Sequence, residues 1–165
     1  MRPRRVHHHL RGLAAPNAHA DDFACFLGAG SYDHAIPSPI NHLISRGEFF
    51  TAYTPYQPEA SQGTLRTIFE YQTMMAELTG MDVANASIYD GASSLAEAVL
   101  MAHSVTGRAE TAWSRGVNPL YQQVVETYCE GPDLRLKMVR LGDGVTDLDA
   151  LGKAVTERTA AVVVQ

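Results

Sequence analysis

Apolar residues recur at helical spacing over several parts of the chain, most regularly between Ser61 and Gly80. Ser61 is a suitable N-cap, and Gly80 is a suitable residue at which a helix ends. The apolar residues between them that share one helical face are Leu65, Ile68, Phe69, Met75 and Leu78. This pattern predicts one long helix.

Shorter helices are predicted at four other places. One lies between Ser38 and Gly47, and another follows Asp90 and stops at Gly107. Asn118-Pro119 is typical of the start of a third helix, and Thr146 is a suitable cap for a fourth.

Three runs rich in β-branched and apolar residues alternate with these helices, over residues 109–114, 134–141 and 160–164. Alternation of this kind indicates an α/β fold, with a mostly parallel sheet covered by helices. The last run stops at Gln165, whereas a parallel strand normally has neighbours on both sides. We therefore expect the chain to be truncated at its C-terminal end.

The opening of the chain shows no clean period. Residues 1–20 are punctuated by Pro3, Gly12 and Pro16. We expect a basic tail with little fixed structure there, followed by a single domain over residues 21–165.

Charge and composition exclude several classes of protein. The formal net charge of the chain is -5, and without the four arginines of residues 1–12 there remain 9 basic against 18 acidic groups, or -9. An acidic body argues against a nucleic-acid partner, which needs clustered Lys and Arg. No run approaches the roughly 20 apolar residues of a membrane-spanning helix. We expect small molecules or proteins as partners, and no membrane.

The two cysteines, Cys25 and Cys129, lie far apart in a chain without a secretory signal. This favours a reducing cytoplasm. The Arg-rich opening also fits an organellar transit peptide, although it lacks serine.

Two loops carry candidate chemistry. Ala92, Ser93 and Ser94 follow Asp90-Gly91 at the predicted start of a helix, where backbone N–H groups, hydroxyls and the helix dipole suit a phosphate. The alternative is that Asp90 simply caps the helix. In the second loop, Tyr53, Thr54, Tyr56 and Gln57 lie between prolines that stiffen the backbone. They could line a polar pocket or a subunit interface, or form an ordinary turn.

Other signals are weaker. Gly28-Ala29-Gly30 lacks the third glycine of a dinucleotide loop, since residue 33 is Asp33. The histidines show no metal-ligand spacing, so we expect no metal site. Lys137 and Lys153 are the only lysines, and we assign a catalytic role to neither.

Four long motifs follow one another along the chain. They are Phe26-Leu27-Gly28-Ala29-Gly30-Ser31-Tyr32-Asp33, Tyr53-Thr54-Pro55-Tyr56-Gln57-Pro58-Glu59, Ser61-Gln62-Gly63 and Leu78-Thr79-Gly80-Met81-Asp82-Val83-Ala84-Asn85-Ala86-Ser87. In this order they resemble the glycine decarboxylase, or P-protein, family. Tyr89-Asp90-Gly91-Ala92 is similar to subunit 1 of its two-subunit form. The resemblance runs from about Asp22 to Gln165 and does not account for the basic segment of residues 1–20.

The resemblance implies part of the large domain of the aspartate-aminotransferase-type fold, fold type I of the pyridoxal-phosphate enzymes. It also implies an activity, in which glycine is decarboxylated on pyridoxal phosphate and the aminomethyl group passes to the lipoyl arm of the H-protein. The Schiff-base lysine then belongs to a second subunit, so this chain alone is expected to be inactive.

For individual residues, the resemblance places Ala92, Ser93 and Ser94 at the position of the phosphate loop in the related fold. The loop is expected to keep the shape of a phosphate loop, but the resemblance does not require that it binds the cofactor. It places Tyr53, Thr54, Tyr56 and Gln57 along the shared cleft. One alternative is a non-catalytic module that packs against the lysine-bearing subunit. A second is another pyridoxal-phosphate decarboxylase or aminotransferase, against which the motifs from Tyr53 to Glu59 and from Leu78 to Ser87 argue.

Overall fold

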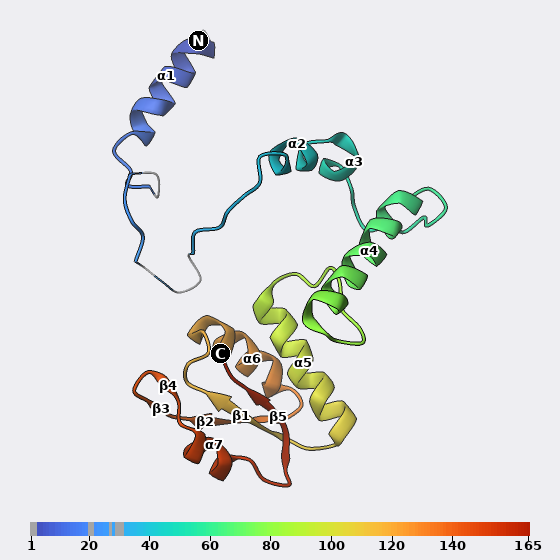
Figure 1. Cartoon of the computed structure of the whole chain (residues 1–165), viewed down its shortest axis with the longest axis vertical. Helices are drawn as coiled ribbons and strands as arrows, with labels where there is room; N and C mark the ends of the chain where they lie inside the picture. The colour runs from blue at the N-terminus through green and yellow to red at the C-terminus, as the bar shows by residue number, and fades with distance from the viewer. Residues whose placement is uncertain (1–2, 20–21, 27, 29–31) are drawn as a thin grey trace. The chain divides into compact units, whose positions relative to one another are not determined.

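The structure is a computed structural model that describes residues 3–19, 22–26, 28 and 32–165. The chain divides into two compact units, Met1–Thr51 and Ala52–Gln165 (Figure 1). The first of the four motifs is only partly covered, because Leu27 and residues 29–31 lie outside the described residues. Within the described ranges, no helix is both long enough and apolar enough to cross a membrane.

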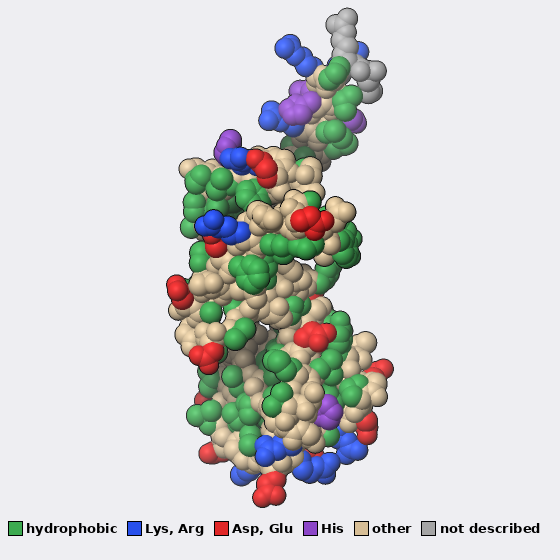
Figure 2. Space-filling view, turned by 90° about the vertical axis from the view of Figure 1, so that its right-hand side faces the viewer, with side chains coloured by type: hydrophobic (Ala, Val, Ile, Leu, Met, Phe, Trp, Pro, Cys, Tyr) green, Lys and Arg blue, Asp and Glu red, His purple; other side chains and the backbone are tan. Residues whose placement is uncertain are grey.

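The first unit contains the helices α1 (Pro3–Ala14), α2 (Ile40–Ile44) and α3 (Gly47–Phe50). The expectation of little fixed structure in residues 1–20 is wrong for α1. Pro3 costs nothing in a first helical turn, and Val6, Leu10 and Leu13 share one helical face. Figure 2 shows Arg, His and hydrophobic side chains on α1 and no acidic side chain.

The second unit begins with the two longest helices, α4 (Gln62–Thr79) and α5 (Gly91–Thr106). Both end as predicted, because Gly80 and Gly107 adopt the left-handed conformation that favours glycine, with φ of 69° and 68°. Ser61 precedes α4 but makes no side-chain capping hydrogen bond. The side-chain amide of Gln72 donates to the Ala84 carbonyl at 2.8 Å, which fixes α4 to the segment that follows it.

The remaining elements form an α/β layer structure. In chain order they are β1 (Glu110–Ser114), α6 (Pro119–Glu130), β2 (Arg135–Val139), β3 (Leu141–Gly142), β4 (Val145–Thr146), α7 (Leu148–Ala154) and β5 (Thr159–Val163). The three longer strands make a parallel sheet in the order β2-β1-β5, so β1 is its central strand. The predicted parallel sheet flanked by helices is thus confirmed.

A small hairpin and one cap differ from the expectations. β3 and β4 pair antiparallel across Asp143 and Gly144, whose φ angles of 50° and 82° suit a tight hairpin turn. Thr146 belongs to this hairpin and does not cap α7. Asp147 does so instead, because its carboxylate accepts a 2.9 Å hydrogen bond from the Ala150 amide.

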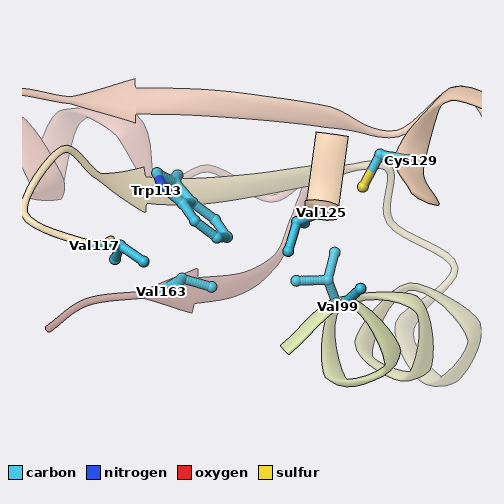
Figure 3. Packing of buried hydrophobic residues seen from close by; sticks show 7 residues of the cluster. Val99, Trp113, Val117, Val125, Cys129 and Val163 are labelled. Carbon is cyan, nitrogen blue, oxygen red and sulfur yellow. The ribbon is translucent and has the colours of Figure 1, made fainter. Parts of the chain in front are cut away.

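The core of the second unit lies between the sheet and the helix pair α5 and α6 (Figure 1), whereas α7 contacts β1 and β2. Trp113 of β1 is fully buried among valines from three elements, shown in Figure 3 as Val99, Val125 and Val163. Its indole N–H has no hydrogen-bond partner among the residues described. This core holds α5 firmly against the sheet and so fixes the position of its N-terminus.

Candidate functional site

The loop of exposed tyrosines precedes α4. The rings of Tyr53 and Tyr56 lie 6.1 Å apart at an interplanar angle of 50°, and 79% and 78% of their respective surfaces are exposed. The loop backbone is fixed by hydrogen bonds: the Tyr56 amide donates to the Thr54 carbonyl, and the Gln57 carbonyl accepts from the amides of Ala60 and Ser61. The fixed backbone therefore presents two phenols to the surroundings.

The N-terminus of α5 is the second candidate. Asp90 has an extended backbone, and its carboxylate accepts a 2.7 Å hydrogen bond from the Ser93 amide. Hydrogen bonds from the side chain and the backbone of Ser93 lower the pKa of Asp90 below its ordinary value. Asp90 therefore caps the helix, the alternative that the sequence left open.

A groove of about 620 Å³ runs beside this helix start and is lined by Ser93 and Ser94, together with Tyr89, Glu97 and Tyr128. Ala92 does not line the groove, because it is buried against the rest of the unit at 5% exposure. The structure thus brings two of the three predicted cofactor residues into one groove.

The two predicted parts of the site are not joined directly. In the part of the chain that the structure describes, no hydrogen bond or ring contact links the loop of residues 53–57 to residues 92–94, and no residue of that loop lines the groove. Whether Tyr53, Thr54, Tyr56 and Gln57 face a shared cleft stays a prediction.

A third polar cluster, which the sequence analysis missed, lies at the carboxyl end of the sheet. The hydroxyls of Ser114 and Thr146 are 2.6 Å apart, and the Gly116 amide donates to the Ser114 hydroxyl. The Asn118 amide donates to the Gln165 side-chain oxygen at 3.1 Å. Ligands of open α/β sheets bind beyond the carboxyl ends of the strands, so the polar residues after β1 were the available signal.

The donors at α5 do not fit the phosphate of pyridoxal phosphate, the cofactor implied by the family resemblance. A carboxylate already accepts the Ser93 amide, and no Lys or Arg is among the groove residues that the structure describes. Glu97 adds a second carboxylate to the same groove. A phosphate would therefore meet negative charge where a phosphate site supplies positive charge.

Comparisons with known proteins identify the family. The family model described as "Glycine cleavage system P-protein" matches residues 3–165. The expectation that the resemblance begins near Asp22 was thus wrong, because the match includes most of the basic opening.

Relatives and a solved structure agree with this match. The probable glycine dehydrogenase (decarboxylating) subunit 1 of Desulforamulus reducens is 52% identical over 95% of this chain and 35% of its own length. The corresponding protein of Bacillus subtilis is 53% identical over 94% of this chain and 35% of its own length.

A crystal structure of glycine decarboxylase (P-protein) of the glycine cleavage system, in inhibitor-bound form, matches with a TM-score of 0.85 and 48% identity. The match covers all of this chain and 36% of that one. This chain thus spans little more than a third of the length of the proteins that it matches. The chain belongs to the glycine cleavage system P-protein family.

Proposed function

We propose that the chain forms part of subunit 1 of a two-subunit glycine decarboxylase. In the complete enzyme, glycine loses carbon dioxide and the remaining aminomethyl group passes to the lipoyl arm of the H-protein. The observation that carries this proposal is the 52% identity over 95% of the chain to a protein named as that subunit. The activity belongs to the whole assembly, of which this chain supplies one part.

Pyridoxal phosphate is the cofactor of the proposed assembly, with its Schiff-base lysine on the second subunit. The two lysines of this chain support that placement. The Lys137 ammonium lies 2.6 Å from the Glu110 carboxylate, and Lys153 lies on α7, so neither lines the groove at α5. Free Cys25 and Cys129 fit the reducing cytoplasm in which we place the assembly.

We assign to Tyr53, Thr54, Tyr56 and Gln57 the role of lining the cleft shared with the second subunit. The high exposure of both tyrosines supports this, since a fixed loop with exposed phenols can supply hydrogen bonds to a polar substrate such as glycine. The rival function is a non-catalytic module that packs against the lysine-bearing subunit. In that case the same tyrosines would contribute contact area only.

Conservative substitutions in the reconstituted full-length complex separate the two functions. Tyr53→Phe and Tyr56→Phe keep the rings and remove the hydroxyls, and Tyr71→Phe on α4 is a matched control. If the hydroxyls serve the site, glycine-dependent exchange of carbon dioxide falls by roughly tenfold or more while assembly by gel filtration is unchanged. Exchange equal to that of the control, with intact assembly, contradicts the catalytic role and supports the packing module.

A further inference from the structure

We propose that Asp90 closes the N-terminus of α5 to phosphate, so that this chain keeps the loop-to-helix shape of a phosphate site but excludes the ligand. The inference rests on the proposed function in one respect, namely that the cofactor of the assembly carries a phosphate. It assigns a specificity-determining role to Asp90.

The first argument is the occupation of the helix start. A helix leaves the amides of its first turn without intrahelical partners, and these amides are what a phosphate would bind. Here the Asp90 carboxylate accepts a hydrogen bond from the Ser93 amide at 2.7 Å. The chain's own anion therefore takes the position of a phosphate oxygen.

The second argument is charge. A phosphate within hydrogen-bond reach of Ser93 would lie a few ångströms from the Asp90 carboxylate, and the two negative charges would repel each other. Hydrogen bonds lower the pKa of Asp90, so its carboxylate is ionised throughout the neutral range. Glu97, one turn further along α5, lines the same groove as Ser93 and Ser94 and adds to the repulsion.

The third argument is space. A Cβ atom added to Gly91, the first residue of α5, would lie 2.5 Å from the Tyr121 hydroxyl oxygen. The phenol of Tyr121 on α6 therefore fills the space beside the first helical residue. A ligand that approached the Gly91 backbone would have to displace this side chain.

The position of Ser93 and Ser94 suggests phosphate binding, but together these contacts give the two serines the role of stabilising the start of the helix. Ser93 satisfies the Asp90 cap, and the Ser94 amide donates to the Asp90 carbonyl at 3.0 Å in the first helical turn. In the proposed assembly the affinity for the cofactor phosphate must then come from the second subunit.

Titration of the 165-residue chain with inorganic phosphate tests the proposal directly. Binding is followed by phosphorus NMR at constant ionic strength for wild type and for two variants of the cap. Asp90→Gly removes the carboxylate and leaves the Ser93 amide free, and glycine is itself tolerated at the N-cap position of a helix. Asp90→Asn removes the charge and keeps an oxygen acceptor. Asp149→Asn, in the exposed first turn of α7, controls for the change in net charge.

We expect no saturable phosphate binding by wild type and by Asp149→Asn. Asp90→Gly should bind phosphate at least roughly tenfold more tightly than these two proteins, and the affinity of Asp90→Asn should lie between that of wild type and that of Asp90→Gly. Circular dichroism establishes that each variant is folded, and Asp90→Asn decides the matter if Asp90→Gly is not. Cap variants that bind phosphate no better than Asp149→Asn would overturn the proposal. Saturable binding by wild type that is weakened by joint Ser93→Ala and Ser94→Ala substitution would also overturn it. Neither result depends on carbon dioxide exchange, so the proposed function is judged separately.

Discussion

The Lys137 ammonium lies 2.6 Å from one carboxylate oxygen of Glu110, and Arg158 Nε lies 3.3 Å from the other. Glu110 begins the central strand β1 and is only 5% exposed. Its two cationic partners come from β2 and from the segment that leads into β5. One buried carboxylate therefore connects all three strands of the parallel sheet near the start of β1.

Replacement of Glu110 by Gln should destabilise the second unit. The isosteric amide keeps the shape but leaves Lys137 and Arg158 without a counter-charge beside a buried group. We expect the melting temperature at pH 7 to fall by roughly 5 °C or more. Thermal unfolding followed by circular dichroism measures this, with the exposed Glu157→Gln as a control that should change little. Equal melting temperatures for the two variants would mean that the pairs contribute nothing to stability.

The same carboxylate should make stability depend on acid pH. The hydrogen bond from Lys137 is the main cause that lowers the pKa of Glu110. A lowered folded-state pKa gives stability that is full above the unfolded pKa of about 4.3 and is lost as the pH falls through the folded value. The stability gap between wild type and Glu110→Gln should thus be constant from pH 7 to about pH 5 and shrink in more acidic solution. Denaturant unfolding across this range measures the gap, and a gap that widens on acidification has the wrong sign.

Substitutions of two valines of α5 distinguish the contribution of core packing to stability from that of helix propensity. Val99 is 1% exposed in the core beside Trp113, whereas Val105 is 80% exposed on the same helix (Figure 3 shows Val99). Val99→Ala should cost about 2 kcal/mol through lost burial and the resulting cavity. Val105→Ala should stay within about 0.5 kcal/mol of wild type. Chemical unfolding measures both, and similar values for the pair would contradict the assigned core.

The elements that the sequence predicted correctly carry strong local signals. Gly80 and Gly107 end α4 and α5 because each adopts a positive φ that few other residues tolerate. Asn118 opens α6 because its side chain accepts from the Leu120 amide, and Pro119 suits the first helical position. In these cases the residue that stops or starts the helix acts within a few positions of itself, so no tertiary information is needed.

The features that the sequence did not predict depend on a turn between very short strands, on a choice between two local roles, or on a contact between residues distant in sequence. Asp143-Gly144 is a strong local hairpin signal, yet the two-residue strands beside it are too short to show a period. At the site, the capping role of Asp90 was one of two alternatives that a local pattern could not separate. The approach of Tyr121 to Gly91 depends on how α6 packs against α5, which no local pattern reveals.

The close approach of Tyr121 to Gly91 leads to a prediction for substitution of Gly91. Alanine normally stabilises a helix by up to about 1 kcal/mol relative to glycine, and Gly152→Ala in α7, where the new Cβ meets nothing within 4 Å, should show such a gain. Gly91→Ala should show none, because the new methyl group must displace the Tyr121 phenol. The two variants are compared by chemical unfolding. A full gain at Gly91 would mean that Tyr121 moves aside without cost.

The two cysteines should differ widely in their reaction with a thiol reagent. Cys25 is exposed, whereas Cys129 is 3% exposed in the core, and burial, followed by the nearby charge of Glu126, raises the pKa of its thiol. Labelling by a maleimide at pH 7, resolved by mass spectrometry of peptides, should therefore modify Cys129 at least roughly a hundredfold more slowly than Cys25.

If Cys129 reacts only when the core opens, its rate should follow the stability of the core. A loss of about 2 kcal/mol in Val99→Ala should then speed the labelling of Cys129 by roughly thirtyfold and leave that of Cys25 unchanged, because Cys25 is already exposed in the folded chain. Val105→Ala is the matched control and should leave both rates near those of wild type. Labelling of Cys129 at the rate of Cys25 in wild type would show that α6 does not hold this thiol in the core.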